Sequence, residues 1–173
     1  MRGGRVSLVL VLGLLPLLPG PCGDDSPVEG KRLPGSVSSL DELATEVLAG
    51  LASADTSRLE ALRLTEAEHN GWVYPELPAA RPENNHPAEL AWANIETRNA
   101  AALADLLPAF ADRTLEHGGV ECRGPTMPFE SYVVYTDCWV RVWLDGGEPR
   151  PVQLFKDVVD RDGELKIFRY YEP

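Results

Sequence analysis

The apolar residues of this chain repeat with one spacing before residue 113 and with another after it. Between residues 38 and 68, and again between 88 and 110, they recur at helical intervals. From Arg113 onward they alternate with polar residues, as half-buried strands require. Helices first and strands last are typical of an α+β domain. The 173 residues suffice for one such domain with a real core and are too few for two.

Capping sequences mark where the early helices are expected to begin. Ser39 and Glu42 have the spacing of a capping box, and the apolar residues of a first helix follow them. A second, short helix is expected from Asp55 or Thr56. Thr65 and its partner three residues later repeat the capping-box spacing, which predicts a further turn or two.

A longer helix is expected after Pro87, because proline is favoured at the first helical position. Its apolar stripe is interrupted by Asn99, which must find a hydrogen-bond partner if it is buried. We expect that partner to be nearby backbone, with a ligand as the alternative. Leu107 precedes Pro108, which predicts a kink or the end of the helix.

The second half of the chain predicts four strands in an antiparallel meander. DGGEP and DRDG are the turns between the last three strands. The predicted strands are residues 114–124, 130–144, 150–160 and 164–172.

One face of the second predicted strand is too aromatic for an ordinary wet surface. Trp139, Arg141 and Trp143 alternate there, and arginine between tryptophans is suited to cation–π stacking. The sequence leaves two readings open, cover from within the chain and a surface for a partner. We predict that this face is covered, by the proline-rich segment described next or by a second copy of the chain.

Residues 69–87, HNGWVYPELPAARPENNHP, follow neither a helical nor a strand period. Their four prolines exclude a continuous helix and would leave gaps in a central strand. We interpret this segment, called the strap below, as a cover over the core, with an insert at residues 72–87. In the alternative reading Trp72 and Tyr74 line the mouth of a pocket.

The first residues are typical of an export signal. MRGGR is basic, and the apolar run at residues 6–19 is shorter than the ~20 residues of a membrane-spanning helix. LLPGPCGDDSP then resembles the lipobox of bacterial lipoproteins. The resemblance implies a signal peptide at 1–21, acylation of Cys22, a tether at 22–37 and a single domain at 38–173 in a bacterial cell envelope.

The net charge limits the classes of partner that the chain can bind, and the cysteine count predicts a disulfide. Cleavage after residue 21 removes two of the 16 basic residues and leaves 14 against 27 acidic ones, a net charge of −13. Such a surface repels nucleic acid. With Cys22 acylated, Cys122 and Cys138 remain in an oxidising compartment on apolar strand faces, which predicts a disulfide between them. Two buried free thiols are the alternative.

The order of elements resembles the nuclear-transport-factor-two-like superfamily. The residues that carry this resemblance are LAGLASADTSRLEALRLTEAE and DVVDRDGELKIFRYYE. It implies a cone-like packing of the helices on the meander, with a cavity between them. No catalytic residue is carried over.

Few residues point to chemistry. The three histidines have no metal-ligand spacing, and DRDGE lacks the later ligands of a calcium loop. The TEAEH group, which contains His69, is interpreted as a solvated helix face. We therefore expect a lipid-anchored binding or accessory protein without catalysis, metal or cofactor, whose ligand or envelope partner is unknown. The alternatives are a small cyclase or isomerase that uses the cone cavity and a structural module that dimerises through the sheet.

Overall fold

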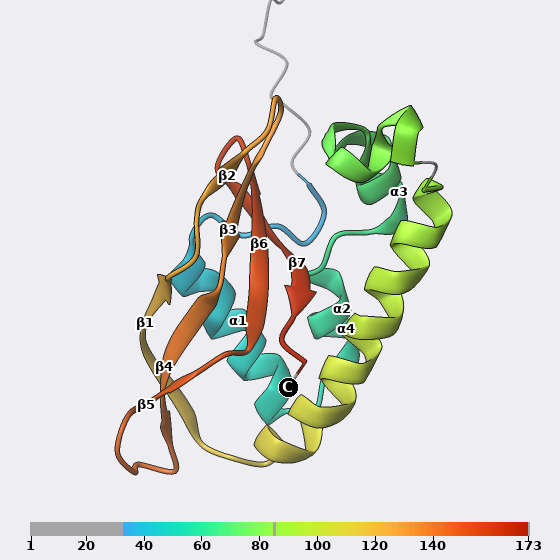
Figure 1. The fold of residues 1–173 in the computed structure, drawn as a ribbon. Helices are drawn as coiled ribbons and strands as arrows, with labels where there is room; N and C mark the ends of the chain where they lie inside the picture. Colours follow the sequence, from blue (N-terminus) through green and yellow to red (C-terminus); the bar gives the residue numbers. More distant parts are fainter. Residues whose placement is uncertain (1–32, 85, 173) are drawn as a thin grey trace, which may run out of the picture. The chain divides into compact units, whose positions relative to one another are not determined.

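The computed structural model describes residues 33–84 and 86–172, so the expected signal peptide, the expected acylation site at Cys22 and most of the expected tether lie outside the described residues. Figure 1 shows helices first along the chain and strands last. The strands form two antiparallel sheets, which confirms the α+β class. No helix in the described ranges is long and apolar enough to cross a membrane.

The first helix, α1 (Leu40–Ala52), begins where its cap predicts. The Ser39 hydroxyl accepts a hydrogen bond from the Glu42 N–H at 3.1 Å. The Glu42 carboxylate closes the cap on Ser38, accepting from both its N–H and its hydroxyl. The apolar face of α1 is buried against the strands.

The next two helices are short and are also capped by their own side chains. In α2 (Thr56–Ala61) the Asp55 carboxylate accepts from the third N–H of the helix. In α3 (Glu66–Glu68) Thr65 and Glu68 form the complete reciprocal capping box. The predicted helix starts are therefore confirmed.

The strap consists of consecutive short helical turns. A single π-turn opens it, and three 3₁₀ turns follow. Proline occupies an early position in these 3₁₀ turns, where its missing N–H has no helical partner to lose. The turns are η1 (His69–Val73), η2 (Tyr74–Glu76), η3 (Pro78–Ala80) and η4 (Pro82–Asn84).

The long helix α4 spans Ala88–Phe110 and passes through Pro108. The helix therefore does not end at Leu107, one of the two outcomes expected there. Pro108 sits in the last turn, where the missing N–H removes one hydrogen bond and the Ala111 N–H still bonds the Leu107 carbonyl at 2.9 Å.

Asn99 docks α4 onto the last strand, β7 (Glu164–Tyr170). Its side-chain oxygen accepts from the Tyr170 N–H at 2.8 Å, and its amide nitrogen lies 3.4 Å from the Phe168 carbonyl oxygen. The Asn99 side chain is buried, and both its oxygen and its nitrogen have a backbone hydrogen-bond partner. The hydrogen-bond partner of Asn99 is therefore backbone, which is the partner expected from the sequence.

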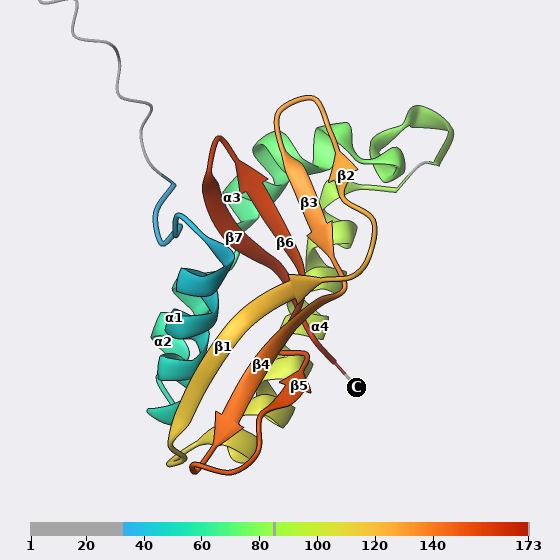
Figure 2. The same cartoon turned by 90° about the vertical axis from the view of Figure 1, so that its left-hand side faces the viewer.

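The strands are not one four-stranded meander, which corrects that expectation. They are shorter and more numerous, and they divide between two sheets (Figure 2). The three-stranded sheet has the order β1 (Leu115–Cys122), β4 (Cys138–Leu144), β5 (Arg150–Val152). The four-stranded sheet has the order β2 (Met127–Pro128), β3 (Val133–Thr136), β6 (Phe155–Arg161), β7.

The chain passes from one sheet to the other after β1, after β3 and after β5, and the last two of these breaks lie together. Asp137, with φ +54°, separates β3 from β4, and Gln153 lies between β5 and β6. The Asp137 carboxylate accepts from the Gln153 amide at 2.8 Å and from the Trp139 indole N–H at 3.0 Å. Aspartate tolerates the left-handed conformation better than most residues, so this position suits a break.

Two apolar clusters fill the interior. The larger one joins α1, α2 and α4 to both sheets, and its central side chains are fully buried. The smaller cluster lies under the strap and comprises Leu64, Val73, Tyr132, Val134 and Val159. The strap thus covers a part of the core. Val37 pairs with Leu165, so the packed fold begins before residue 38.

Cys122 and Cys138 are opposite each other at the end of the β1–β4 ladder and form a disulfide. The prediction from strand phase is confirmed.

Candidate functional site

The aromatic stripe lies on the outer face of β4. The alternate residues of this strand are buried in the core, whereas Trp139 and Trp143 are half-buried and Arg141 is exposed. Alternation of side chains along a strand therefore sets a row of large groups against solvent.

A bulge in β1 makes room for this row. The register between β1 and β4 shifts between His117 and Val120, at two glycines. A Cβ on Gly118 would lie 2.4 Å from ring atoms of Trp143, so the indole occupies the space that a side chain would need. Trp143 is therefore covered from within the chain, which is one of the two alternatives that the sequence leaves open for this face.

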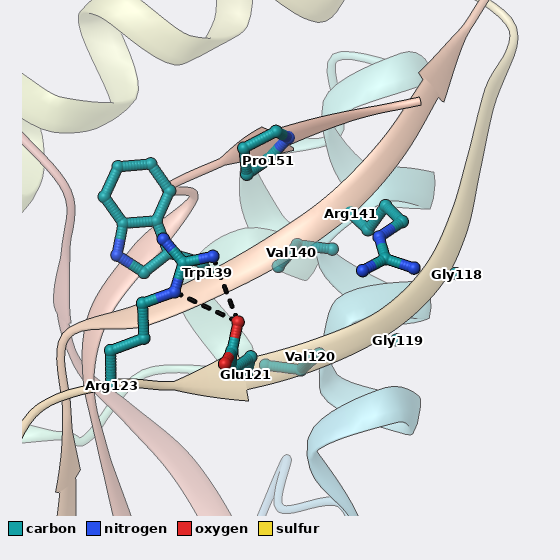
Figure 3. A pocket seen from close by; sticks show the side chains of 9 residues that line it. All are labelled: Gly118, Gly119, Val120, Glu121, Arg123, Trp139, Val140, Arg141 and Pro151. Atoms are coloured by element: carbon teal, nitrogen blue, oxygen red, sulfur yellow. Dashed lines mark hydrogen bonds and ion pairs between the residues drawn. The ribbon is translucent and has the colours of Figure 1, made fainter. Parts of the chain in front are cut away.

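The Trp139 indole is held by two residues, Asp137 and Arg123. Its indole N–H donates to Asp137, and the Arg123 guanidinium lies 5.1 Å from its ring centroid. Arg123 is fixed in turn by Glu121, with two nitrogens about 3.0 Å from the same carboxylate oxygen (Figure 3). Sequence reasoning missed Arg123, although the predicted disulfide sets Cys122 opposite Cys138 and so makes Arg123 a diagonal neighbour of Trp139 across the antiparallel pair.

Two grooves meet at Trp139. The first has a volume of about 330 Å³ and the second about 390 Å³, and Trp139 and Pro151 line both. We call the two grooves together the Trp139 surface. The first is lined by Gly118, Gly119, Val120, Glu121, Arg123, Trp139, Val140, Arg141 and Pro151, and the second by Asp105, Leu106, Trp139, Pro151, Val152, Gln153 and Tyr171.

Arg141 is the cation of the Trp139 surface that has no partner in the described part of the chain. It is exposed and points into the first groove in Figure 3. It forms no hydrogen bond or ion pair with residues 33–84 or 86–172. The predicted cation–π pairing of the stripe is therefore made by Arg123 and not by Arg141.

The strap does not cover the Trp139 surface, which corrects that part of the prediction. The Trp72 ring packs edge-on against Tyr132, with their ring centroids 5.6 Å apart. The Arg161 guanidinium lies 4.6 Å from the centroid of the Trp72 ring. The Tyr74 hydroxyl donates to the carbonyls of Ala79 and His86 within the strap. Trp72 packs against the smaller apolar cluster, and Tyr74 is buried within the strap. In Figures 1 and 2 the strap lies at the end of α4 away from β5.

His69 is fully buried, which corrects the solvated reading of TEAEH. The π-turn that follows α3 rotates the imidazole inward, among the rings of Tyr74, Trp92 and Phe168, with centroids 5.4 to 6.3 Å away. Its Nδ1 lies 2.7 Å from Asn70 Oδ1, and its Nε2 has no partner among the described residues. Burial lowers the pKa of this imidazole.

The adjacent Glu68 is also engaged. It pairs with Lys166 at 2.8 Å, and the lysine side chain is 1% exposed. This pair joins the end of α3 to β7 beneath the strap. Glu68 and His69 therefore anchor the strap, whereas Glu66 and Ala67 are exposed as the solvated reading expects.

Groups with shifted pKa values lie outside the Trp139 surface. Burial raises the pKa of Tyr132 and of Tyr170, whereas hydrogen bonds from Ser131 lower the pKa of Glu76 and one from the Thr114 N–H lowers that of Asp145. None of these residues lines either groove. Within the described ranges, no three His, Cys, Asp or Glu side chains gather as a metal site would need.

Comparison of the chain with known protein families, curated proteins and solved structures finds no match.

Proposed function

We propose that this chain is a lipid-anchored binding module of a bacterial cell envelope and that the Trp139 surface is its binding site. The observation that carries the proposal is the half-exposed indole of Trp139, fixed by Asp137 and Arg123 between two grooves. Tryptophan and arginine dominate the energetics of interfaces, and a side chain held in place loses little entropy when a partner binds.

Binding without catalysis is supported by how the interior is filled. An enzyme of the cyclase or isomerase kind needs a cavity that two titratable groups share within hydrogen-bond reach. Here the space between the sheets and the helices is taken by fully buried apolar side chains, among them Leu51, Phe155 and Ile167. The Trp139 surface is open, and its Glu121 is already paired with Arg123.

The remaining parts of the proposal rest on sequence. Acylation of Cys22 would attach the module to a membrane, and the order of helices and strands supports a divergent member of the nuclear-transport-factor-two-like superfamily. Intact mass of membrane-extracted protein tests the anchor. A diacylglyceryl adduct on a chain that starts at residue 22 is expected, and a soluble chain that starts elsewhere would refute it.

Site-specific photocrosslinking in cells of the source bacterium tests the binding site. A benzophenone amino acid replaces Pro151 in the Trp139 surface or, as a matched control, the exposed Glu89 on α4. We expect a discrete adduct from position 151 that disappears when Trp139→Ala is added, and none from position 89. No adduct from 151, or equal adducts from both positions, would overturn the assignment of the site.

A further inference from the structure

We infer that the Trp139 surface takes an extended peptide segment of a partner protein. One carboxylate of that segment pairs with Arg141, and an adjacent apolar side chain enters the second groove. This inference rests on the proposed binding function and adds to it the chemical class of the ligand.

The charge of the first groove indicates that the ligand carries a carboxylate. Arg141 is exposed and unpaired in the described part of the chain, whereas Glu121, the acid in the same groove, is neutralised by Arg123. A guanidinium binds carboxylates through paired N–H donors. The net charge of −11 repels polyanions at longer range, so a ligand with one or two carboxylates fits better than a phosphate polymer.

The second groove determines the apolar half. Leu106, Val152 and Tyr171 line it beside the shared Pro151 and Trp139, and Leu106 is buried beneath it. About 390 Å³ is enough for one large apolar side chain with its backbone. An extended chain that crosses from Arg141 over Pro151 would therefore place neighbouring side chains on the two sides.

Hydrogen-bonding capacity favours a peptide over a saccharide. A saccharide needs several free donors and acceptors for its hydroxyl groups. At the Trp139 surface the indole N–H and the Gln153 amide are both bound to Asp137, and Arg123 is bound to Glu121. What is left is the Arg141 cation in the first groove and, in the second, the Asp105 carboxylate and the Tyr171 hydroxyl beside apolar side chains. This set suits the charged and apolar side chains of a peptide.

The peptide is expected to bind through its side chains. β5 is an edge strand, and its central residue, Pro151, stands opposite Arg141 in the register. Proline has no N–H, so this edge cannot donate at its centre to an added strand. Recognition by strand addition is therefore disfavoured.

A display library of random ten-residue peptides, selected on the full mature chain, tests the inference. Wild type is expected to enrich peptides with an Asp or Glu next to a large apolar residue. Synthetic copies should bind wild type at least about tenfold more tightly than Arg141→Glu, and selection on Arg141→Glu should replace the acid by Lys or Arg. Arg113→Glu, a charge reversal at an exposed residue that lines neither groove, should bind like wild type.

The outcomes separate this inference from the proposed function. Peptides that bind wild type and not Trp139→Ala, but show no acidic preference and no effect of Arg141→Glu, refute the inference and leave the binding site standing. Binding of a glycan array without peptide enrichment also refutes it. No binding of either library refutes both. Circular dichroism of each variant confirms that it is folded.

Discussion

At position 69 a titratable imidazole occupies a place that would suit an apolar side chain. It is ringed by Tyr74, Trp92 and Phe168, and a proton added to its unpartnered Nε2 would find no acceptor. Burial has the larger effect on the His69 pKa, although the hydrogen bond with Asn70 and the charge of Glu66 both oppose the decrease. Protonation therefore disfavours the packed strap.

The sign of the pH dependence follows from the lowered pKa. The unfolded chain, with a histidine pKa near 6.5, binds the proton before the folded chain does. Stability is unaffected by His69 above that pH and falls as pH decreases from about 6.5 towards the lowered value, by at most about 1.4 kcal/mol per pH unit. Urea unfolding at pH 7.5 and 5.5 measures this loss.

His69→Phe should lose less stability between these two pH values than wild type, because phenylalanine fills the same ring-lined site without a proton to bind. The control is His86→Gln, since residue 86 is exposed and serves Tyr74 only through its backbone carbonyl. An equal loss in His69→Phe and wild type would contradict the assignment.

At the scale of elements, Asp137 lies at one of the points where the chain passes from one sheet to the other. Its carboxylate ties the break between β3 and β4 to the break between β5 and β6, and its φ of +54° would strain most other residues. The Asp137 carboxylate thus links two of the points at which the chain passes between the sheets.

Substitutions at Asp137 separate these two effects. Asp137→Ala should destabilise the chain by about 2–4 kcal/mol, because the Gln153 amide and the Trp139 N–H lose their acceptor and the left-handed backbone is strained. Asp137→Gly relieves the backbone alone, and Asp137→Asn keeps an acceptor, so both should lose less. Urea unfolding followed by circular dichroism gives the order. Equal stability of Ala and wild type would contradict it.

The same residue explains what the sequence pattern does and does not predict. Alternation runs unbroken from Tyr132 to Leu144, so the buried face of both β3 and β4 is readable, and with it the disulfide. The chain moves from one sheet to the other at Asp137 without interrupting the alternation of apolar and polar residues. The sequence pattern therefore does not reveal the break between β3 and β4. Helix caps are local and were readable as well, whereas the burial of His69 depends on distant rings that only the fold brings together.

At the scale of the whole molecule, the disulfide closes a loop that contains β2, β3 and the Asp137 break. The two cysteines are 16 residues apart, which corresponds to about 3 kcal/mol of chain entropy. A Cys122→Ala, Cys138→Ala double variant should be less stable than wild type by about this amount in urea unfolding. Non-reducing peptide mapping should find the two cysteines linked, and two alkylatable thiols in unreduced, unfolded protein would contradict the bond.

The placement of the four tryptophans has a consequence for spectroscopy. Trp72 and Trp92 report on the strap, whereas Trp139 and Trp143 report on the outer face of the three-stranded sheet. The intrinsic emission of the protein is therefore the sum of two spatially separate signals. A variant that keeps one pair alone would reveal whether acid releases the strap before the sheet melts or whether both are lost in one transition.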